Sequence, residues 1–153
     1  MKIDLSSVPV ETGTNYPEAF RAAVEGRSRQ RVGNAAGLKK FGINLTTLQP
    51  GAQSALRHWH AAQDEFVYVV AGELILITDE GEQTLQAGEM AGFAAGRANG
   101  HHLVNRAETE AVYLEIGDRT RPDTAQYPDE DLVHELAANG TGQFCHKNGD
   151  RYE

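Results

Sequence analysis

The sequence has little cysteine and few basic residues. Cys145 is the single cysteine among 153 residues, so no disulfide can close within the chain. No stretch approaches the roughly 20 consecutive apolar residues of a membrane-spanning helix. Fourteen Lys and Arg stand against 22 Asp and Glu, which gives a net charge of -8. Because this surplus repels phosphate backbones and anionic lipids, we expect neither nucleic acid nor a membrane as a partner.

The first residues, from Met1 to Asp4, also lack the apolar core of a secretion signal. Together with the single cysteine, this predicts a cytoplasmic protein. Hydrophobic residues make up 40% of the chain and charged residues 24%, which is the composition of an ordinary globular protein. We expect one domain, with an N-terminal arm over residues 1–35, a barrel over 36–118 and a tail over 119–153 packed on the barrel.

Short runs of strand-forming residues, separated by turns rich in Gly, Asn and Asp, fill the middle of the chain. Parallel strands need crossover connections of about a dozen residues, and none is present, so antiparallel pairing is favoured. The fold class predicted is all-β, a jelly-roll barrel or double-stranded β-helix. The expected strands are Phe41–Leu48, Ser54–His58, Glu65–Ala71, Leu74–Thr78, Gln83–Gln86, Met90–Ala94, His101–Asn105 and Ala111–Ile116.

Two short helices are expected outside this region. The first covers Pro17 to Glu25, with Asn15 as a possible cap. The second lies in the tail, where the acidic residues after Pro128 suit the positive end of a helix that continues over Leu132 to Ala138.

Four of the six histidines fall in two close pairs, His58 with His60 and His101 with His102. Residues two apart on a strand share a face, so His58 and His60 project side by side. Glu65 follows a turn-like segment that can return its carboxylate to the same centre. Two imidazoles and a carboxylate suit one divalent iron, manganese, nickel or zinc ion.

These residues resemble the first motif of the cupin superfamily. The spacing G-x6-H-x-H-x4-E-x6-G matches that motif with one extra residue after the leading glycine, and it runs through Gly51, His58, His60, Glu65 and Gly72.

The second cupin motif is echoed by Gly88, Gly96, His101 and Asn105. Ala94 stands where the family usually has proline, and four residues rather than two separate Gly96 from His101. The turn before the last histidine is therefore altered relative to the family pattern.

The resemblance implies a single-domain cupin with a metal ion held by His58, His60, Glu65 and His101, and its tail is similar to that of a bacterial branch of such proteins. The family includes dioxygenases, decarboxylases, sugar isomerases and epimerases, lyases and non-catalytic binding proteins. The expected function is a metal-dependent enzyme that acts on a small polar metabolite, a sugar derivative or a carboxylate, by Lewis-acid or dioxygenase-type chemistry. A non-catalytic module that binds a small molecule or a metal is the alternative.

Two ligand positions have alternatives. His101 is favoured over His102 because its spacing fits the second motif. Asp64 can replace Glu65, but an inward Glu65 also places a row of two valines inward, so Glu65 is favoured.

Further candidates lie near the expected barrel mouth. Tyr113 and Glu115 share one face of the last strand, where they are candidates for proton donor and acceptor if that face points inward, or solvated residues if it does not. Arg97 is a candidate for binding a substrate carboxylate. Trp59 and Tyr68 are expected to face outward, where burial is worth a few kcal/mol each, so that a partner surface or the N-terminal arm covers them; a homodimer is predicted.

Overall fold

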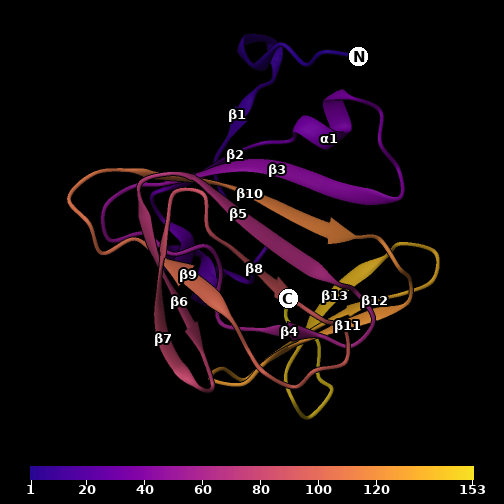
Figure 1. Cartoon of the computed structure of the whole chain (residues 1–153). Helices are drawn as coiled ribbons and strands as arrows, with labels where there is room; N and C mark the ends of the chain where they lie inside the picture. The colour runs from indigo at the N-terminus through magenta and orange to yellow at the C-terminus, as the bar shows by residue number, and fades with distance from the viewer.

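The computed structural model describes all 153 residues and consists mainly of antiparallel strands (Figure 1). The helices are short: η1 (Leu5–Ser7), η2 (Glu18–Val24) and α1 (Val32–Ala35). The strands are β1 (Val10–Glu11), β2 (Arg27–Gln30), β3 (Phe41–Leu48), β4 (Trp59–His60), β5 (Glu65–Ala71), β6 (Glu73–Thr78), β7 (Gly81–Gln86), β8 (Met90–Phe93), β9 (His102–Val104), β10 (Ala111–Asp118), β11 (Asp123–Tyr127), β12 (Leu132–Leu136) and β13 (Gly142–Cys145). The longest helix, η2, has seven residues, and none has the length and hydrophobicity to span a bilayer.

The strands form three sheets in a jelly-roll arrangement. A six-stranded sheet has the order β1-β2-β3-β10-β5-β8, and two smaller sheets have the orders β13-β12-β11-β4 and β7-β6-β9. Figure 1 shows β3, β10 and β5 crossing the upper half of the molecule, with β6, β7 and β9 at lower left and β11 to β13 at lower right. The two smaller sheets meet through a bridge between His58 and His101. The predicted all-β jelly-roll class is therefore confirmed.

In the central region the predicted strands agree with the observed ones, because buried and exposed side chains alternate along each strand. In β5, Val67 and Val69 are buried, whereas Phe66 and Val70 are exposed. This period of two buries one face of the strand against the core and leaves the other outside. The bounds predicted for β3 and β5 are those observed, and the strands from β6 to β10 differ from prediction by one or two residues at their ends.

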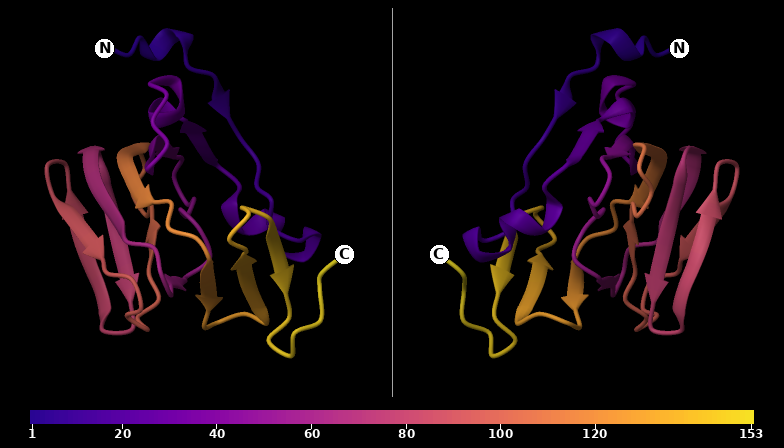
Figure 2. Two further views of the ribbon diagram at one scale, coloured as in Figure 1. Left: turned by 90° about the vertical axis from the view of Figure 1, so that its right-hand side faces the viewer. Right: turned by 90° about the vertical axis from the view of Figure 1, so that its left-hand side faces the viewer.

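Two hydrophobic clusters hold the layers together. The larger one lies between the sheets and includes the fully buried Leu48, Val69, Leu74 and Tyr113. The smaller one joins η2 to the C-terminal strands, and Figure 2 shows this early segment beside the yellow strands. Both terminal segments thus add strands or packing to the sheets, while their division into arm, barrel and tail stays a prediction.

Three local predictions are corrected. The segment from Pro17 forms the 3-10 helix η2, and Asn15 does not cap it because Pro17 occupies the cap position without a side-chain hydrogen bond. Within the expected strand Ser54–His58 only His58 makes a bridge, an isolated one, and Gln53 just before it makes another; regular pairing begins only at β4.

The predicted helix in the tail is also wrong. Residues 132–136 form β12, which pairs with β11 on one side and β13 on the other. The acidic residues after Pro128 lie in the turn between β11 and β12. Pairing on both edges, with Leu132 fully buried, outweighs the local helix signal in this short segment.

Candidate metal centre

The candidate ligands come from three segments of the chain that the jelly-roll brings together. His58 immediately precedes β4 and His60 ends it, Glu65 begins β5, and His101 immediately precedes β9. The backbone N–H of His58 donates to the carbonyl of His101 at 3.2 Å, and the reverse hydrogen bond is 2.9 Å long. This bridge places the two histidines side by side although they are distant in sequence.

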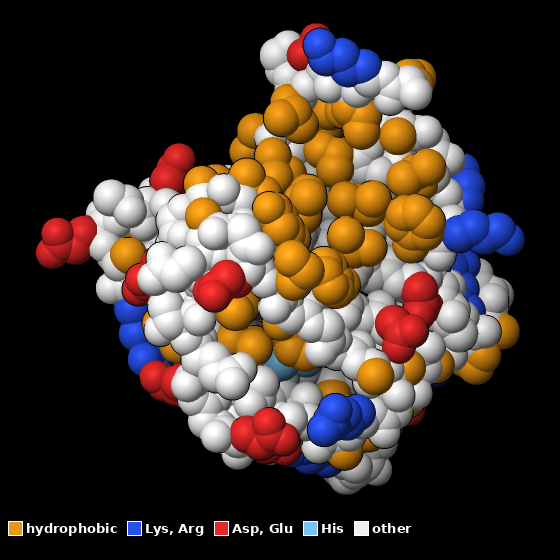
Figure 3. All heavy atoms as spheres, viewed as in Figure 1, with side chains coloured by type: hydrophobic (Ala, Val, Ile, Leu, Met, Phe, Trp, Pro, Cys, Tyr) orange, Lys and Arg blue, Asp and Glu red, His pale blue; other side chains and the backbone are white.

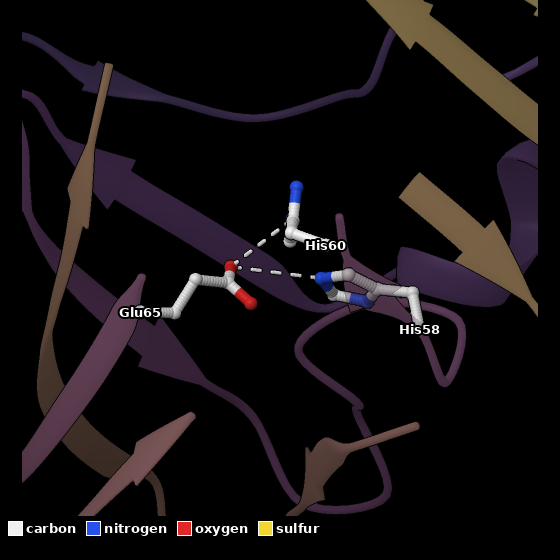
Figure 4. A group of neighbouring side chains, drawn as sticks. All are labelled: His58, His60 and Glu65. Carbon is white, nitrogen blue, oxygen red and sulfur yellow. Dashed lines mark ion pairs between the residues drawn. The ribbon is translucent and has the colours of Figure 1, made fainter. Parts of the chain in front are cut away.

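The three imidazoles converge on the carboxylate of Glu65. Nε2 of His58 and Nε2 of His60 lie 3.6 and 3.4 Å from Oε1, and Nε2 of His101 lies 2.8 Å from Oε2. The ligand atoms of His58, His60 and Glu65 all lie within 4.8 Å of one another (Figure 4). Atoms bound to one ion at about 2.1 Å and near right angles are about 3 Å apart, so these separations suit a shared ion.

Hydrogen bonds at the far side of two rings fix which nitrogen faces the centre. Nδ1 of His58 lies 2.7 Å from the carbonyl oxygen of Leu56, and Nδ1 of His60 lies 2.6 Å from Oδ2 of Asp123. Since both partners are acceptors, each Nδ1 carries a proton and donates it. In the neutral ring, Nε2 then presents its lone pair toward Glu65, as a metal ligand requires.

Two buried polar atoms at the centre have no hydrogen-bond partner in the protein. Oε2 of Glu65 makes no aligned hydrogen bond, although Nε2 of His101 is 2.8 Å away, and Nδ1 of His101 has no partner. A buried carboxylate oxygen without a hydrogen bond is costly unless another group satisfies it. The donor set of imidazoles and carboxylate and this unsatisfied oxygen both fit a divalent transition metal ion.

The electrostatics of the centre also suit a cation. Burial raises the pKa of Glu65, but the three imidazoles of His101, His58 and His60 beside the carboxylate outweigh it and hold the pKa well below its usual range. Burial lowers the pKa of His60, whereas Glu65 and Asp123 raise it to about 9. Burial lowers the pKa of His101. An ionised carboxylate therefore lies at the centre. A metal ion that binds there has to displace the proton of His60.

The two alternative ligands lie outside this cluster. Nδ1 of His102 is 2.9 Å from the carbonyl oxygen of Ala55, and the ion pairs of Glu65 are with His58, His60 and His101 rather than with His102. Asp64 is exposed, and its Oδ1 accepts a hydrogen bond from the backbone N–H of Ala95 at 2.7 Å. Both side chains are engaged elsewhere.

Comparison with known proteins identifies the family. Residues 44–117 match the family model described as Cupin domain. The chain is 44% identical to a crystal structure named as a sugar phosphate isomerase from a cupin superfamily, from Silicibacter pomeroyi, with a TM-score of 0.95 over 100% of this chain and 97% of that one. The chain belongs to the cupin superfamily. A putative sugar phosphate isomerase from Acidithiobacillus ferrooxidans is 29% identical, with a TM-score of 0.74 and coverage of 82% and 79%. Among curated proteins, none matches this sequence.

The cupin centre has a supporting residue that the sequence did not point to. Asp123, at the start of β11, is buried; its Oδ2 binds His60, and its Oδ1 accepts a hydrogen bond from the N–H of Ala62 at 2.8 Å. Phe93 stacks on His101 with ring centroids 3.5 Å apart. No local spacing signals Asp123, because only the pairing of β11 with β4 brings it to the site.

The candidate ligands line a cavity of about 410 Å³, which also includes Tyr113 and Glu115 of β10. Tyr113 is buried, its hydroxyl has no hydrogen-bond partner, and burial with the charge of Glu115 raises its pKa. Oε1 of Glu115 accepts from Thr46 at 3.0 Å and Asn44 at 3.3 Å and pairs with Nε of Arg29 at 2.8 Å. The structure thus places the face of β10 that carries Tyr113 and Glu115 toward the interior.

Arg97 does not line the cavity of about 410 Å³ in this cupin. It is exposed, in the turn after β8, and lines a second cavity of about 820 Å³ that also reaches Glu65 and His101. It forms no ion pair with the protein, and its role in binding substrate stays a prediction.

Proposed function

We propose that this cupin is a metal-dependent enzyme that acts on a small polar metabolite, a sugar derivative in the first place, by Lewis-acid chemistry. The observation that carries the proposal is the convergence of His58, His60 and His101 on Glu65 at the wall of an open cavity. A divalent ion held by these four side chains would supply polarisation of a substrate oxygen or, if it is iron, dioxygenase-type chemistry.

Tyr113 and Glu115 are the residues best placed to handle protons. The raised pKa of Tyr113 keeps its hydroxyl protonated, so it can donate a hydrogen bond to a substrate oxygen. All hydrogen bonds and the ion pair of Glu115 end on Oε1, which leaves Oε2 without a protein partner. That oxygen is suited to accept a proton from a carbon next to a carbonyl, the step an aldose–ketose isomerisation requires.

The similarity to the Silicibacter pomeroyi protein supports an isomerase over a dioxygenase, since that protein is named a sugar phosphate isomerase. Its identity of 44% extends over nearly the whole of both chains. We therefore place isomerisation of a sugar derivative first and oxidation of a carboxylate second.

The first test is metal content. The His58→Ala/His60→Ala variant is expected to lose stoichiometric metal after anaerobic purification and elemental analysis, which also identifies the ion in the native protein. His146→Ala is the control, because His146 lies at the surface, paired with Asp131. Full retention of metal in the double variant would defeat the proposal.

The second test is turnover by the metal-loaded protein. Interconversion of an aldose and a ketose, without oxygen consumption, is the expected result. Stoichiometric metal with no turnover of sugar derivatives or carboxylates would instead favour a non-catalytic binding module.

We also propose a cytoplasmic homodimer, formed through the outer face of the six-stranded sheet. Phe41, Phe66, Val70 and Met90 are exposed on β3, β5 and β8, and Figure 3 shows a continuous hydrophobic surface over these strands. An apolar surface of this kind on a soluble protein is typical of an interaction site. Tyr68 lies half-buried on this face, and the half-buried Trp59 lines the second cavity together with Phe41, Phe66 and Met90.

A further inference from the structure

Three arginines form a row that leads from the interior to the surface, which we call the arginine row: Arg27, Arg29 and Arg31. They alternate with other residues along β2 and just beyond it, so their side chains share a face. Arg27 is 6% exposed, the side chain of Arg29 is 25% exposed, and that of Arg31 is 51% exposed. One end of the row is therefore buried and the other reaches solvent.

The positive charge of the row exceeds the negative charge that it meets. The guanidinium of Arg27 donates only to neutral carbonyls, of Ser54 at 2.6 Å and of Gly13 at 3.1 Å, and forms no ion pair. Arg29 pairs with the carboxylate of Glu115, and Arg31 pairs with that of Glu11. Three guanidiniums thus face two carboxylates, and a buried cation without a counter-ion favours an anionic ligand.

The terminal nitrogens of the two outer arginines are available. Arg29 pairs with Glu115 through Nε, and Arg31 pairs with Glu11 through Nε at 2.5 Å. Neither arginine uses a terminal nitrogen in a hydrogen bond to the protein. Those nitrogens form the planar fork that binds two oxygens of an anion at once.

The row also connects two cavities. All three arginines line the cavity of about 410 Å³ that contains the metal ligands. They also line a neighbouring polar vestibule of about 740 Å³, whose other walls are residues 11–15 and which has no hydrophobic residue. A ligand that spans the two cavities can place one end beside the histidines and the other in the vestibule.

We propose that the arginine row binds the phosphate group of a phosphorylated substrate, with Arg29 and Arg31 as its direct ligands. The carbon skeleton then lies beside His58, His60 and Glu65, and this placement rests on the proposed function. A dianion with three terminal oxygens suits two guanidinium forks and a net positive wall better than a carboxylate, which carries one charge.

The test measures binding to metal-free, chelator-treated protein by isothermal titration calorimetry, so that turnover plays no part. The probes are inorganic phosphate, ribose 5-phosphate, ribose and acetate. We expect the two phosphates to bind and to compete with each other, and ribose and acetate to bind at least about tenfold more weakly, since charge-assisted bonds carry the affinity.

Arg29→Gln and Arg31→Gln are each expected to weaken phosphate binding by about tenfold. Arg106→Gln is the matched control, because Arg106 is an exposed arginine in an ion pair with Glu82, outside both cavities. Circular dichroism verifies that each variant folds. Because Arg31 is exposed, its replacement leaves the protein interior intact. Unchanged phosphate affinity in both variants, or equal affinity for acetate and phosphate, would overturn the proposal.

The His58→Ala/His60→Ala variant separates this proposal from the proposed function. It is expected to bind phosphate as the native protein does, because the arginine row needs no metal. If it retains metal but the arginine variants lose phosphate, the metal function fails and the phosphate subsite stands. If it loses both metal and phosphate, the arginine row is not the phosphate site and this inference fails.

Discussion

His60 and Asp123 are joined by a hydrogen bond of 2.6 Å, from Nδ1 to Oδ2, across 63 positions of the sequence. The pairing of β11 with β4 brings them together, since Ala125 lies opposite His60. The same carboxylate accepts the N–H of Ala62, which fixes the turn after the histidine. The C-terminal strands therefore orient a candidate metal ligand as well as closing the fold.

Replacing Asp123 by Asn is expected to weaken metal binding by about tenfold or more, because the partner of a ligating imidazole sets its orientation and basicity. Competition with a chelator of known affinity measures the change. Asp131→Asn is the matched control, because it removes a similar carboxylate–imidazole contact, to His146 at 2.7 Å, at the surface. Equal affinities in the two variants would contradict the role assigned to Asp123.

Metal affinity is expected to rise with pH up to about pH 9. The pKa of His60 is about 9, because Glu65 and Asp123 outweigh the effect of burial. The ion must displace that proton at lower pH, so each unit below pH 9 lowers the apparent affinity by about tenfold. Chelator competition with Zn²⁺ at several pH values measures the slope, and Asp123→Asn is expected to move the start of the decline to lower pH, because Asp123 raises the pKa of His60. An affinity independent of pH would refute the protonated state assigned to His60.

Tyr113→Phe is expected to change the free energy of unfolding by less than about 1 kcal/mol, because its buried hydroxyl has no protein partner to lose. Tyr16→Phe, the control, is expected to cost about 1 to 3 kcal/mol, since the hydroxyl of Tyr16 accepts the buried N–H of Leu56 at 3.2 Å. Urea unfolding compares the two. The same Tyr113 variant is expected to lose turnover, and full turnover would remove the role of its hydroxyl.

Met90→Lys is expected to convert the proposed dimer into a monomer, because Met90 is 53% exposed on the outer sheet face and a buried lysine there lacks a counter-ion. Sedimentation at micromolar concentration measures the mass. Thr84→Lys on β7 adds the same charge at an exposed position on the smaller sheet and is expected to leave the dimer intact. A native protein that is monomeric under these conditions refutes the dimer.

Gly72→Ala is expected to destabilise the fold more than Gly88→Ala. Both glycines have positive φ, +80° and +92°. A Cβ at Gly72 would lie 2.9 Å from the carbonyl oxygen of Glu110, whereas one at Gly88 would meet no atom within 4 Å. We expect the alanine at position 88 to lower the free energy of unfolding by about 1 kcal/mol through backbone strain alone, and the one at position 72 to lower it by about 2 kcal/mol or more. Equal losses in thermal or urea unfolding would show that the close approach does not matter.

The sequence by itself determined the strands of the central region and the convergence of His58, His60 and Glu65. The strands and the shared face of His58 and His60 follow from the period of two along a strand, and the turn-like segment after His60 returns Glu65 to that face, so both depend only on neighbouring residues. Glycines and polar turns marked where the strands end. Local information of this kind failed in the tail, where β12 has a sequence compatible with a helix and only its two strand partners decide between the alternatives.

The tertiary structure alone decided which residues surround those ligands. Asp123 reaches His60 through the pairing of β11, and the arginine row reaches the same cavity through the pairing of β2 with β3. Which strands become neighbours depends on burial and hydrogen bonding summed over the whole chain, so residues far apart in sequence meet without a local signal. A spacing motif can therefore predict the candidate ligands of an ion, whereas the residues that orient them and the proposed anion site beside them are brought together only when the sheets assemble.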